Sequence, residues 1–283
     1  MAGTVTVALV QNNASGEHSA NISGAVAMLR EAAGKGAELI ALPEYVSGFG
    51  INAVGDLDLP AFAEADHPAL AAFRAEAKQL GVVVHVGSLA VRLTDGRIVN
   101  RGFVLDRQGA ISARYDKIHL FDVDLGPGKV YRESNVIAAG NTAVVAPTPW
   151  GGLGLSVCYD LRFAALYRAL AQGGASILSV PAAFTKTTGA VHWHVLNRAR
   201  AIETGSFVIA PCQFGRFPGG GECYGHSLIV DPWGKVLADG GEGAGIVMAT
   251  LDLAEVASAR GRIPALQHDR PFKLPSLASK AAE

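Results

Sequence analysis

The sequence predicts an α/β protein in which two mixed β-sheets pack face to face and helices cover their outer sides. Short apolar runs rich in Val, Ile and Leu alternate along the chain with Ala-rich segments of helical periodicity. Turn motifs also join several neighbouring apolar runs directly, as in β-hairpins. The strand count is high for a chain of 283 residues, which favours two stacked sheets over one.

The individual elements follow from these periodicities. Apolar runs predict strands at residues 5–10, 39–42, 82–90, 98–105, 111–115, 153–157, 177–180, 207–211, 227–230 and 246–251. Apolar residues at helical spacing predict helices at residues 20–34, 68–80, 162–172, 191–204 and 253–261. Turns at residues 94–97, 107–109 and 231–235 each link two strand-like segments. No linker or repeat divides the chain, so we expect a single domain over residues 1–283 with a C-terminal tail at residues 264–283.

The composition excludes several classes of partner. The net charge is −1 and no Lys/Arg cluster is present, which argues against a nucleic-acid or anionic-membrane partner. No run approaches the length of a transmembrane helix, and the first residues resemble a strand more than a signal peptide. Three cysteines without a C-x-x-C spacing suit a reducing compartment, so we expect a cytoplasmic protein. His192 and His194 form an H-x-H pair, but further ligands at metal-site spacing are lacking, so we expect no metal and no cofactor.

Cys158 is the residue whose surroundings carry the most chemical information. The apolar run before it and the helical pattern after it predict a strand, a sharp turn and a helix, with the thiol on the turn. A thiol in that place would be exposed, and the N-terminus of the following helix would favour the thiolate. On this interpretation Cys158 is a nucleophile. The alternative is that it is a small buried hydrophobic residue, as most free cysteines are.

Two charged residues occupy comparable places at the ends of apolar runs. Glu44 follows the predicted strand at residues 39–42, and Lys117 follows the strand at residues 111–115. A cysteine nucleophile needs a proton acceptor and a group that stabilises an oxyanion, and these two residue types supply them. None of the eight histidines stands in a recognisable catalytic setting. Taken singly, each charge could instead be a surface residue that marks a strand end.

Three motifs taken together resemble the nitrilase superfamily of carbon–nitrogen hydrolases. These are L-P-E at residues 42–44, Y-D-K-I-H-L at residues 115–120 and C-Y-D-L-R-F at residues 158–163, and the resemblance extends from residue 5 to about residue 271. It implies that Glu44, Lys117 and Cys158 form a catalytic triad in a four-layer αββα sandwich. It also implies a mechanism without metal or cofactor, and a homodimer or higher oligomer formed through the helical faces.

Further segments resemble the Nit branch of this superfamily, at residues 117–124, 132–134, 181–185, 188–193, 198–203, 224–227 and 231–234. In that branch a second glutamate supports the triad, and Glu133 stands in its place. The resemblance implies an amidase that acts on a small dicarboxylic or peptide-like monoamide, such as deaminated glutathione or α-ketoglutaramate. The alternatives are an N-carbamoyl amino acid or aliphatic amide hydrolase, and a catalytically silent binding protein. Nitrile hydrolysis is less favoured, since Tyr159-Asp160 is typical of amide-cleaving branches.

The chemistry that these residue types allow is consistent with the resemblance. Glu44 would accept the thiol proton of Cys158, and the thiolate would attack the carboxamide to form a thioester. Lys117 and the backbone N–H of Tyr159 would stabilise the oxyanion. Arg162 could bind a substrate carboxylate or pair locally with Asp160. The further candidates for substrate contacts are Tyr45, Phe184, Thr185, His192 and Trp193.

Two departures from the Nit pattern and three loops bear on the substrate pocket. Ala190-Val191 replaces the usual Pro-Ala before His192-Trp193, and Ala164 replaces the proline that normally follows the cysteine motif. The pocket shape depends on the loops at residues 48–58, 126–134 and 213–222. Arg198 and Arg200, on the helix predicted at residues 191–204, are expected to be charges of the surface or of the dimer face.

Overall fold

Two β-sheets form the centre of the molecule in the computed structural model, which describes residues 3–15, 17–126 and 130–273. The first sheet has the strand order β19-β1-β2-β6-β7-β8, and β5 pairs with β6. Its strands are β19 (Gly245–Asp252), β1 (Thr4–Gln11), β2 (Leu39–Ala41), β6 (Val83–Arg92), β7 (Ile98–Leu105), β8 (Ile111–Asp116) and β5 (Phe62–Ala63). The second sheet has the order β11-β12-β13-β14-β17-β18. Its strands are β11 (Val145–Thr148), β12 (Gly151–Leu155), β13 (Ala175–Ser179), β14 (Phe207–Ala210), β17 (Leu228–Val230) and β18 (Val236–Asp239).

The two sheets share one pattern of strand directions. In each, an antiparallel edge pair is followed by two parallel pairs and then by two antiparallel pairs. The parallel strands are β1, β2 and β6 in the first sheet and β12, β13 and β14 in the second. Segments that leave the carboxyl ends of neighbouring parallel strands emerge at the same edge of their sheet. The segments that carry the residues of the candidate site leave the carboxyl ends of β2 in the first sheet and of β12 and β13 in the second.

Alternation of side chains along the strands produces four layers. On β1, Val7 and Leu9 belong to the core cluster that also holds Leu153 and Leu155 of the second sheet. Ala8, between them in sequence, packs into the cluster formed with the two helices on the opposite side. Successive strand residues point to opposite faces, so both faces of the first sheet are buried. The predicted α/β fold of two stacked sheets with outer helices is confirmed.

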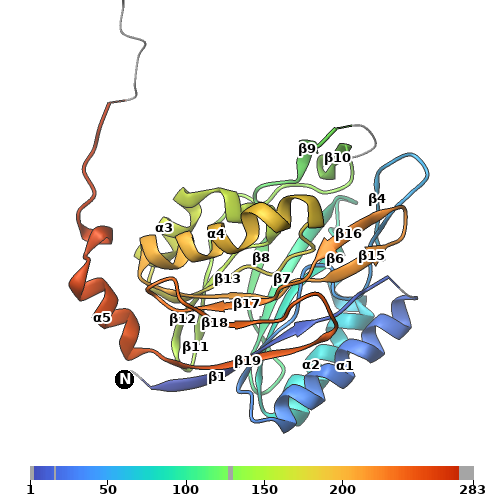
Figure 1. The fold of residues 1–283 in the computed structure, drawn as a ribbon. Helices are drawn as coiled ribbons and strands as arrows, with labels where there is room; N and C mark the ends of the chain where they lie inside the picture. The colour runs from blue at the N-terminus through green and yellow to red at the C-terminus, as the bar shows by residue number, and fades with distance from the viewer. Residues whose placement is uncertain (1–2, 16, 127–129, 274–283) are drawn as a thin grey trace, which may run out of the picture.

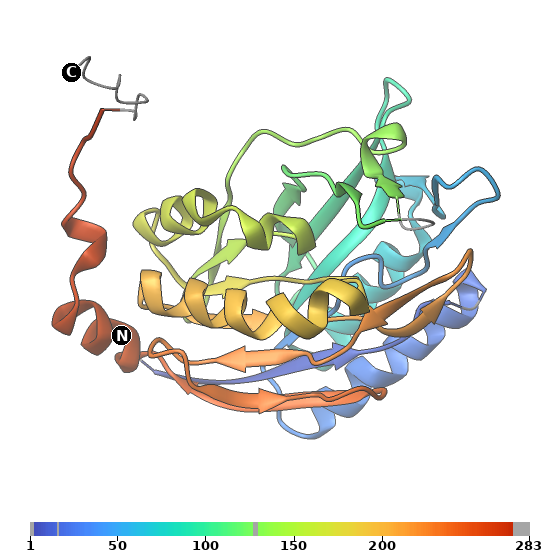
Figure 2. The ribbon, with the colours of Figure 1, turned by 45° about the horizontal axis from the view of Figure 1, so that its top comes forward.

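Helices cover the outer side of each sheet. α1 (His18–Gly34) and α2 (Pro68–Leu80) pack on the first sheet, and α3 (Ala164–Gln172) and α4 (Lys186–Thr204) pack on the second. Figures 1 and 2 show α3 and α4 side by side and far from α1 and α2, with the strands between the two pairs. α5 (Ala254–Arg262) follows β19 at the edge of the sandwich. No helix in the described part of the chain is both long and apolar enough to span a bilayer.

The predicted elements agree with the structure except near the turns that carry function. The strand predicted at residues 153–157 ends at Leu155, and the helix predicted from residue 162 begins at Ala164. Between them lies a 3-10 helix, η3 (Cys158–Arg162). α4 begins at Lys186, five residues before the predicted start. The sequence analysis missed the edge strands β11 and β18 and the short pieces β3 (Gly50–Ile51), β4 (Leu57–Asp58), β5, β9 (Asp122–Asp124), β10 (Val130–Arg132), β15 (Phe214–Phe217) and β16 (Gly221–Tyr224).

The described part of the predicted C-terminal tail touches the body of the protein. It contains a 3-10 helix, η4 (Ala265–Gln267). Asp269 accepts hydrogen bonds from Arg168 at 3.0 Å and from Gln172 at 2.7 Å, and both of these residues lie on α3. The remainder of the predicted tail, at residues 274–283, lies outside the described residues.

A buried histidine connects the two sheets and makes the free energy of unfolding depend on pH. Nδ1 of His85 on β6 is hydrogen-bonded to Oγ of Ser179 on β13 at 2.8 Å, and both residues are buried. Burial lowers the pKa of His85 from 6.5 to about 3. The unfolded chain takes up a proton at this residue below pH 6.5, whereas the folded protein does so only near pH 3. The contribution of neutral His85 to the free energy of unfolding is therefore complete above pH 6.5, and it is lost as the pH falls toward 3.

We expect the wild type to lose more stability than His85→Gln when the pH is lowered from 7 to 5. The difference should be about 2 kcal/mol, at about 1.4 kcal/mol per pH unit below 6.5. Urea unfolding of both proteins at the two pH values measures it. Other groups that titrate in this range contribute equally to both proteins, so equal losses would show that His85 keeps an ordinary pKa in the folded state.

Candidate active site

Four ionisable side chains that the sequence analysis selected lie around one cavity. Glu44 is three residues past the end of β2, Lys117 follows β8 directly, and Cys158 is three residues past the end of β12. Glu133 begins the 3-10 helix η2 (Glu133–Asn135). All four are buried, and all four line the same cavity. The structure thus brings the predicted catalytic set together from both sheets.

Lys117 lies between two carboxylates in this cavity. Its Nζ donates to Oε1 of Glu44 at 3.0 Å, and to Oε2 and Oε1 of Glu133 at 2.8 and 3.1 Å. Burial alone would lower the pKa of Lys117, but the charges of Glu133 and Glu44 outweigh it and raise that pKa well above 10.5. Lys117 is therefore an ammonium ion throughout the physiological pH range. Because the three side chains are at most 5% exposed, solvent screens their interaction little.

Neutral donors complete the hydrogen bonding of the two carboxylates. Nδ2 of Asn100 donates to Oε1 of Glu44 at 2.9 Å and to Oε1 of Glu133 at 3.3 Å. The N–H of Ala183 donates to Oε2 of Glu44 at 2.8 Å, and the N–H of Phe121 donates to Oε2 of Glu133 at 2.7 Å. Buried carboxylates are stable when their lone pairs are satisfied in this way. These contacts fix the orientation of both carboxylates relative to Lys117.

The sequence analysis missed Asn100, although a signal for it exists. Asn100 is fully buried inside β7, where it and Arg101 interrupt the apolar residues of the strand, and a buried polar residue at such a position usually has a specific partner. Its backbone carbonyl also accepts the N–H of Lys117 at 2.9 Å. The hydroxyl of Tyr45 donates to Oε1 of Glu133 at 3.2 Å. Tyr45, predicted as a substrate contact, therefore also holds a carboxylate in place.

Cys158 stands on a strained turn that is held from several sides. Its φ angle is 50°, a left-handed conformation that non-glycine residues rarely adopt, and its N–H donates to the carbonyl of Pro181 at 2.8 Å. Oδ2 of Asp160 accepts the N–H of Val157 at 2.8 Å and the hydroxyl of Tyr115 at 2.7 Å. These bonds close the turn around the cysteine.

Arg200 holds the far end of the same turn, which corrects its prediction as a surface or dimer-face charge. It is only 5% exposed, and its Nε donates to the carbonyl of Leu161 at 3.0 Å. Its Nη1 pairs with Glu203 at 2.8 Å, and its guanidinium lies over the ring of Tyr167. Arg198 is exposed, as predicted. The two arginines differ because positions two apart on a helix point in different directions.

The thiol of Cys158 is neither exposed nor favoured as a thiolate, contrary to the prediction. The residue is 7% exposed, and it lines the cavity together with Glu44. Burial and the charge of Glu44 raise its pKa well above 9.0, although the ammonium of Lys117 acts in the opposite direction. The 3-10 helix that begins at Cys158 has only five residues, so it offers little dipole to offset this burial. The thiol is therefore protonated at neutral pH, and it needs a base at the moment of attack.

Of the remaining predicted substrate contacts, some line the cavity and others lie outside it. Tyr159, Phe184 and Thr185 line it. Trp193 is fully buried behind Phe184, with ring centroids 5.0 Å apart. His192 is exposed on α4, and its Nδ1 lies 3.3 Å from Nη1 of Arg162.

Arg162 is the last residue of η3, and its guanidinium lies over the rings of Tyr159 and Phe184. It borders the wall of the cavity and is absent from the set of residues that line it. Asp160 was considered as the local partner of Arg162, but its carboxylate binds other groups. Its Oδ2 accepts the N–H of Val157 in the turn, and its Oδ1 lies 2.7 Å from Nδ1 of His119. Arg162 therefore supports two aromatic side chains of the wall.

The wall of the cavity is largely aromatic and comes from the three predicted loops together with the strand ends. Its apolar and aromatic side chains are Tyr45, Phe49, Ile51, Leu57, Phe121, Tyr131, Tyr159, Phe184 and Phe217. Arg132, which is exposed, also lines the cavity and brings a second cation to it besides Lys117. Residues 127–129 of the second loop lie outside the described part of the chain. The cavity therefore joins a charged floor to an apolar wall.

This arrangement can perform one kind of chemistry well. A protonated thiol and a carboxylate that can accept its proton line one cavity, together with a permanent cation. A carbonyl carbon attacked by the sulfur would develop negative charge on its oxygen, where a fixed ammonium in a dry site is most effective. The floor of the cavity therefore suits nucleophilic acyl transfer.

Comparisons with known proteins agree with this chemistry. A family model described as carbon-nitrogen hydrolase matches residues 6–261. The deaminated glutathione amidase of Yersinia enterocolitica is 42% identical over 209 residues, which cover 72% of this chain and 73% of that protein. The deaminated glutathione amidase of Synechocystis sp. is 38% identical over 252 residues, which cover 88% and 92%. The solved structure of the C. elegans NitFhit protein matches with a TM-score of 0.85 at 33% identity, over 95% of this chain and 66% of that one.

Proposed function

The chain belongs to the carbon–nitrogen hydrolase family, and on that premise we propose that it hydrolyses the amide of deaminated glutathione or of a related ω-monoamide to a carboxylate. The second product would be cysteinylglycine from deaminated glutathione and ammonia from a primary ω-monoamide. The reaction would pass through a thioester on Cys158. One observation carries this proposal: the ammonium of Lys117 is held between Glu44 and Glu133, and Cys158 lines the same buried cavity beside them. The names of the relatives support the choice of substrate, and the geometry supports the choice of reaction.

The first half of the proposed reaction forms the thioester. Glu44 takes the proton of the Cys158 thiol while the sulfur bonds to the carboxamide carbon, and the π electrons of the carbonyl move onto its oxygen. Lys117 and the N–H of Tyr159 stabilise that oxyanion. When the tetrahedral species collapses, the C–N bond breaks and Glu44 returns the proton to the leaving nitrogen, which departs as cysteinylglycine from deaminated glutathione or as ammonia from a primary amide. Glu133 keeps Lys117 in position and does not itself exchange a proton.

The second half of the reaction releases the acid. Water occupies the place vacated by the leaving amine or ammonia, and Glu44 accepts one of the water protons as the oxygen bonds to the thioester carbon. The oxyanion forms again at the same position. Its collapse breaks the C–S bond, and Glu44 returns the proton to the sulfur. The base, the nucleophile and Lys117 all regain their starting protonation, so the cycle consumes one water for each amide.

The cavity also supports a substrate with an anionic end. A small ω-monoamide carries a carboxylate some distance from its amide, and Arg132 lines the cavity where it is open to solvent. With the amide at Cys158 and its carbonyl toward Lys117, that carboxylate would extend along the aromatic wall toward the guanidinium. The arrangement favours charged monoamides over short neutral aliphatic amides.

A panel of amides tests the proposed substrate class, with ammonia measured for primary amides and cysteinylglycine measured for deaminated glutathione. We expect deaminated glutathione and α-ketoglutaramate to give the highest kcat/KM, well above acetamide or propionamide. N-carbamoyl amino acids are expected to be poor substrates. Turnover of carbamoyl compounds without turnover of ω-amides would overturn the substrate assignment but not the family. Retention of the protein's cellular effect in a Cys158→Ala variant would instead point to a binding role.

We further propose that the protein works as a homodimer in the cytoplasm. Val191, Val195 and Ile202 are each more than half exposed, and their spacing puts them on one side of α4. Exposed apolar side chains grouped on one side of an outer helix are typical of a subunit interface, and Arg198 is the charged residue among them. The three cysteines are all free, as a reducing compartment would keep them. Light scattering of the wild type and of Val195→Glu tests the dimer, and the variant should be monomeric.

A further inference from the structure

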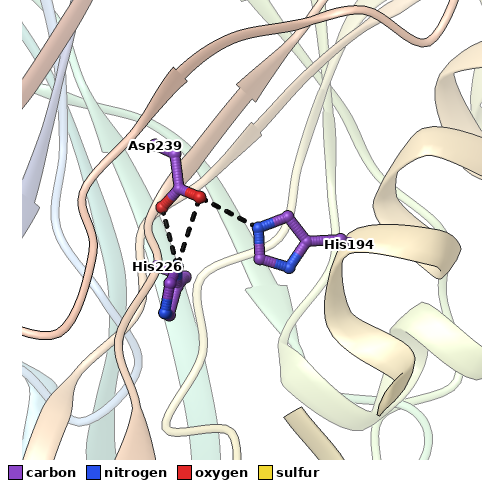
Figure 3. A group of neighbouring side chains, drawn as sticks. All are labelled: His194, His226 and Asp239. Carbon is purple, nitrogen blue, oxygen red and sulfur yellow. Dashed lines mark hydrogen bonds and ion pairs between the residues drawn. The ribbon is translucent and has the colours of Figure 1, made fainter. Parts of the chain in front are cut away.

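We propose that His194, His226 and Asp239 form a binding site for a divalent transition metal of the zinc class. His194 lies on α4, His226 on the segment between β16 and β17, and Asp239 at the end of β18. Figure 3 shows the two imidazole rings directed at the same carboxylate from different elements. The sequence analysis excluded a metal because the H-x-H pair lacked further ligands. Folding supplies those ligands from residues far along the chain.

The spacing of the three ligand atoms is close to that of a metal site. Nε2 of His194 lies 3.0 Å from Oδ2 of Asp239, and Nδ1 of His226 lies 2.9 Å from Oδ1 of the same residue. One ligand atom from each residue lies within 4.8 Å of the other two. Bonds of about 2.0–2.2 Å to a tetrahedral zinc ion place neighbouring ligand atoms roughly 3.3 Å apart. Measured to Oδ2 of Asp239 alone, the nitrogens of His194 and His226 lie 3.0 and 3.2 Å away, which is within a few tenths of an ångström of that spacing.

Contacts around the cluster hold each ligand in orientation. The ring of His226 stacks on that of Tyr224, with centroids 4.4 Å apart. The backbone of His226 has a φ angle of 52°, and its carbonyl accepts the indole N–H of Trp193 at 2.7 Å. Oδ1 of Asp239 accepts the N–H of Gly241 at 2.9 Å. Ligands that are fixed by such outer contacts bind metal more tightly than mobile ones.

The donor set selects the class of metal. Two imidazole nitrogens and one carboxylate oxygen suit zinc and similar transition metals, whereas magnesium and calcium prefer oxygen ligands alone. The three side chains are between one fifth and just over one third exposed, so an ion can reach them from solvent and a water molecule can take the fourth position. Each neutral imidazole would offer its lone pair at the atom named above and keep its proton on the other ring nitrogen. Any imidazolium would release one proton to solvent on binding.

The expected effect of the metal is to fasten α4 to the edge of the second sheet. His194 and Trp193 are neighbours on α4, and Trp193 packs behind Phe184 of the cavity wall. None of the three ligands is among the residues that line the cavity with Cys158. The metal would thus stabilise the support of the cavity wall without taking part in the reaction.

Zinc titration of the full-length protein tests the proposal. The experiment uses Cys158→Ser, because the reactive thiol could itself bind zinc, and wild type with Cys158 alkylated as a second form. Isothermal titration calorimetry should show one zinc ion per chain. His194→Gln, His226→Gln or Asp239→Asn should each weaken the affinity at least about 10-fold. His192→Gln is the matched control, because His192 lies on the same helix but outside the cluster. The zinc affinity of this variant should equal that of the parent protein.

Thermal unfolding provides the second readout. Zinc at about 100 times its Kd should raise the Tm of the parent protein by about 5 °C or more, and magnesium at the same concentration should not. The three ligand variants should lose the zinc-dependent shift while still unfolding cooperatively without metal. If the parent does not bind zinc at millimolar concentration, or if the ligand variants bind as tightly as His192→Gln, the proposal is wrong.

Discussion

Replacing Cys158 with alanine is expected to lower the rate of ammonia release by at least about 10⁴-fold and to leave the protein folded. The loss is large because the thiol is the group proposed to bond to the substrate, and neither Glu44 nor Lys117 can replace it. The substitution removes a single sulfur atom and introduces no charge, so the ion network around Lys117 should remain in place. Steady-state kinetics and circular dichroism measure the two effects.

Cys212 provides the matched control for this substitution. It is fully buried, burial raises its pKa to about 12, and it is absent from the residues that line the cavity. Cys212→Ala should keep its activity within a few-fold of wild type. If Cys158→Ala retained a tenth of the activity or more, a different nucleophile would have to be sought. Equal losses in both variants would point to a general effect of removing a buried sulfur.

Replacing Lys117 with methionine is expected to have the largest combined effect on stability and activity. Methionine matches the length of the lysine but leaves Glu44 and Glu133 buried without their cation. Removal of one partner of a buried ion pair typically costs about 3–5 kcal/mol of unfolding free energy. Loss of one oxyanion donor typically lowers kcat by about 10²–10³-fold. Urea unfolding and kinetics of the same preparation measure both quantities.

A second variant separates the structural role of Lys117 from its role in the reaction. In Lys117→Met/Glu133→Gln one of the two uncompensated carboxylates becomes a neutral amide, so part of the lost stability should return. Activity should not return, because the oxyanion partner is still missing. Recovery of activity together with stability would mean that Lys117 acts only by holding the fold, and the proposed oxyanion role would then be wrong.

The sequence predicted those features of the fold that depend on local patterns. Apolar runs located the ten strands given above to within a few residues. Glu44, Lys117 and Cys158 were selected as a set because the three motifs that hold them resemble the nitrilase superfamily. Edge strands such as β18 were missed because their exposed residues break the apolar pattern. The apolar pattern of the sequence was thus sufficient to locate the ends of the strands with apolar cores.

The features that could not be predicted depend on how deeply a side chain is buried and on contacts between segments that are distant in sequence. The sequence gives no measure of how far Cys158 lies from solvent, and its burial between two sheets reverses the expected preference for the thiolate. Asn100 reaches both carboxylates from a strand that carries no motif. Asp239 lies 45 residues from His194 in sequence, so their pairing follows only from the register of β17 with β18 and the packing of α4.

The central claim is that Cys158, with Glu44 as its base, forms a thioester with the amide carbon. The most direct measurement is acid quenching of the enzyme during turnover of deaminated glutathione, followed by peptide mass spectrometry, with hydroxylamine present in a parallel reaction. The account predicts that the peptide with Cys158 gains the mass of the acyl group, that is, deaminated glutathione less cysteinylglycine. It also predicts that hydroxylamine diverts product to the hydroxamate in the wild type but not in Cys158→Ala. An adduct on another residue, or hydrolysis with neither an adduct nor a hydroxamate, would contradict it.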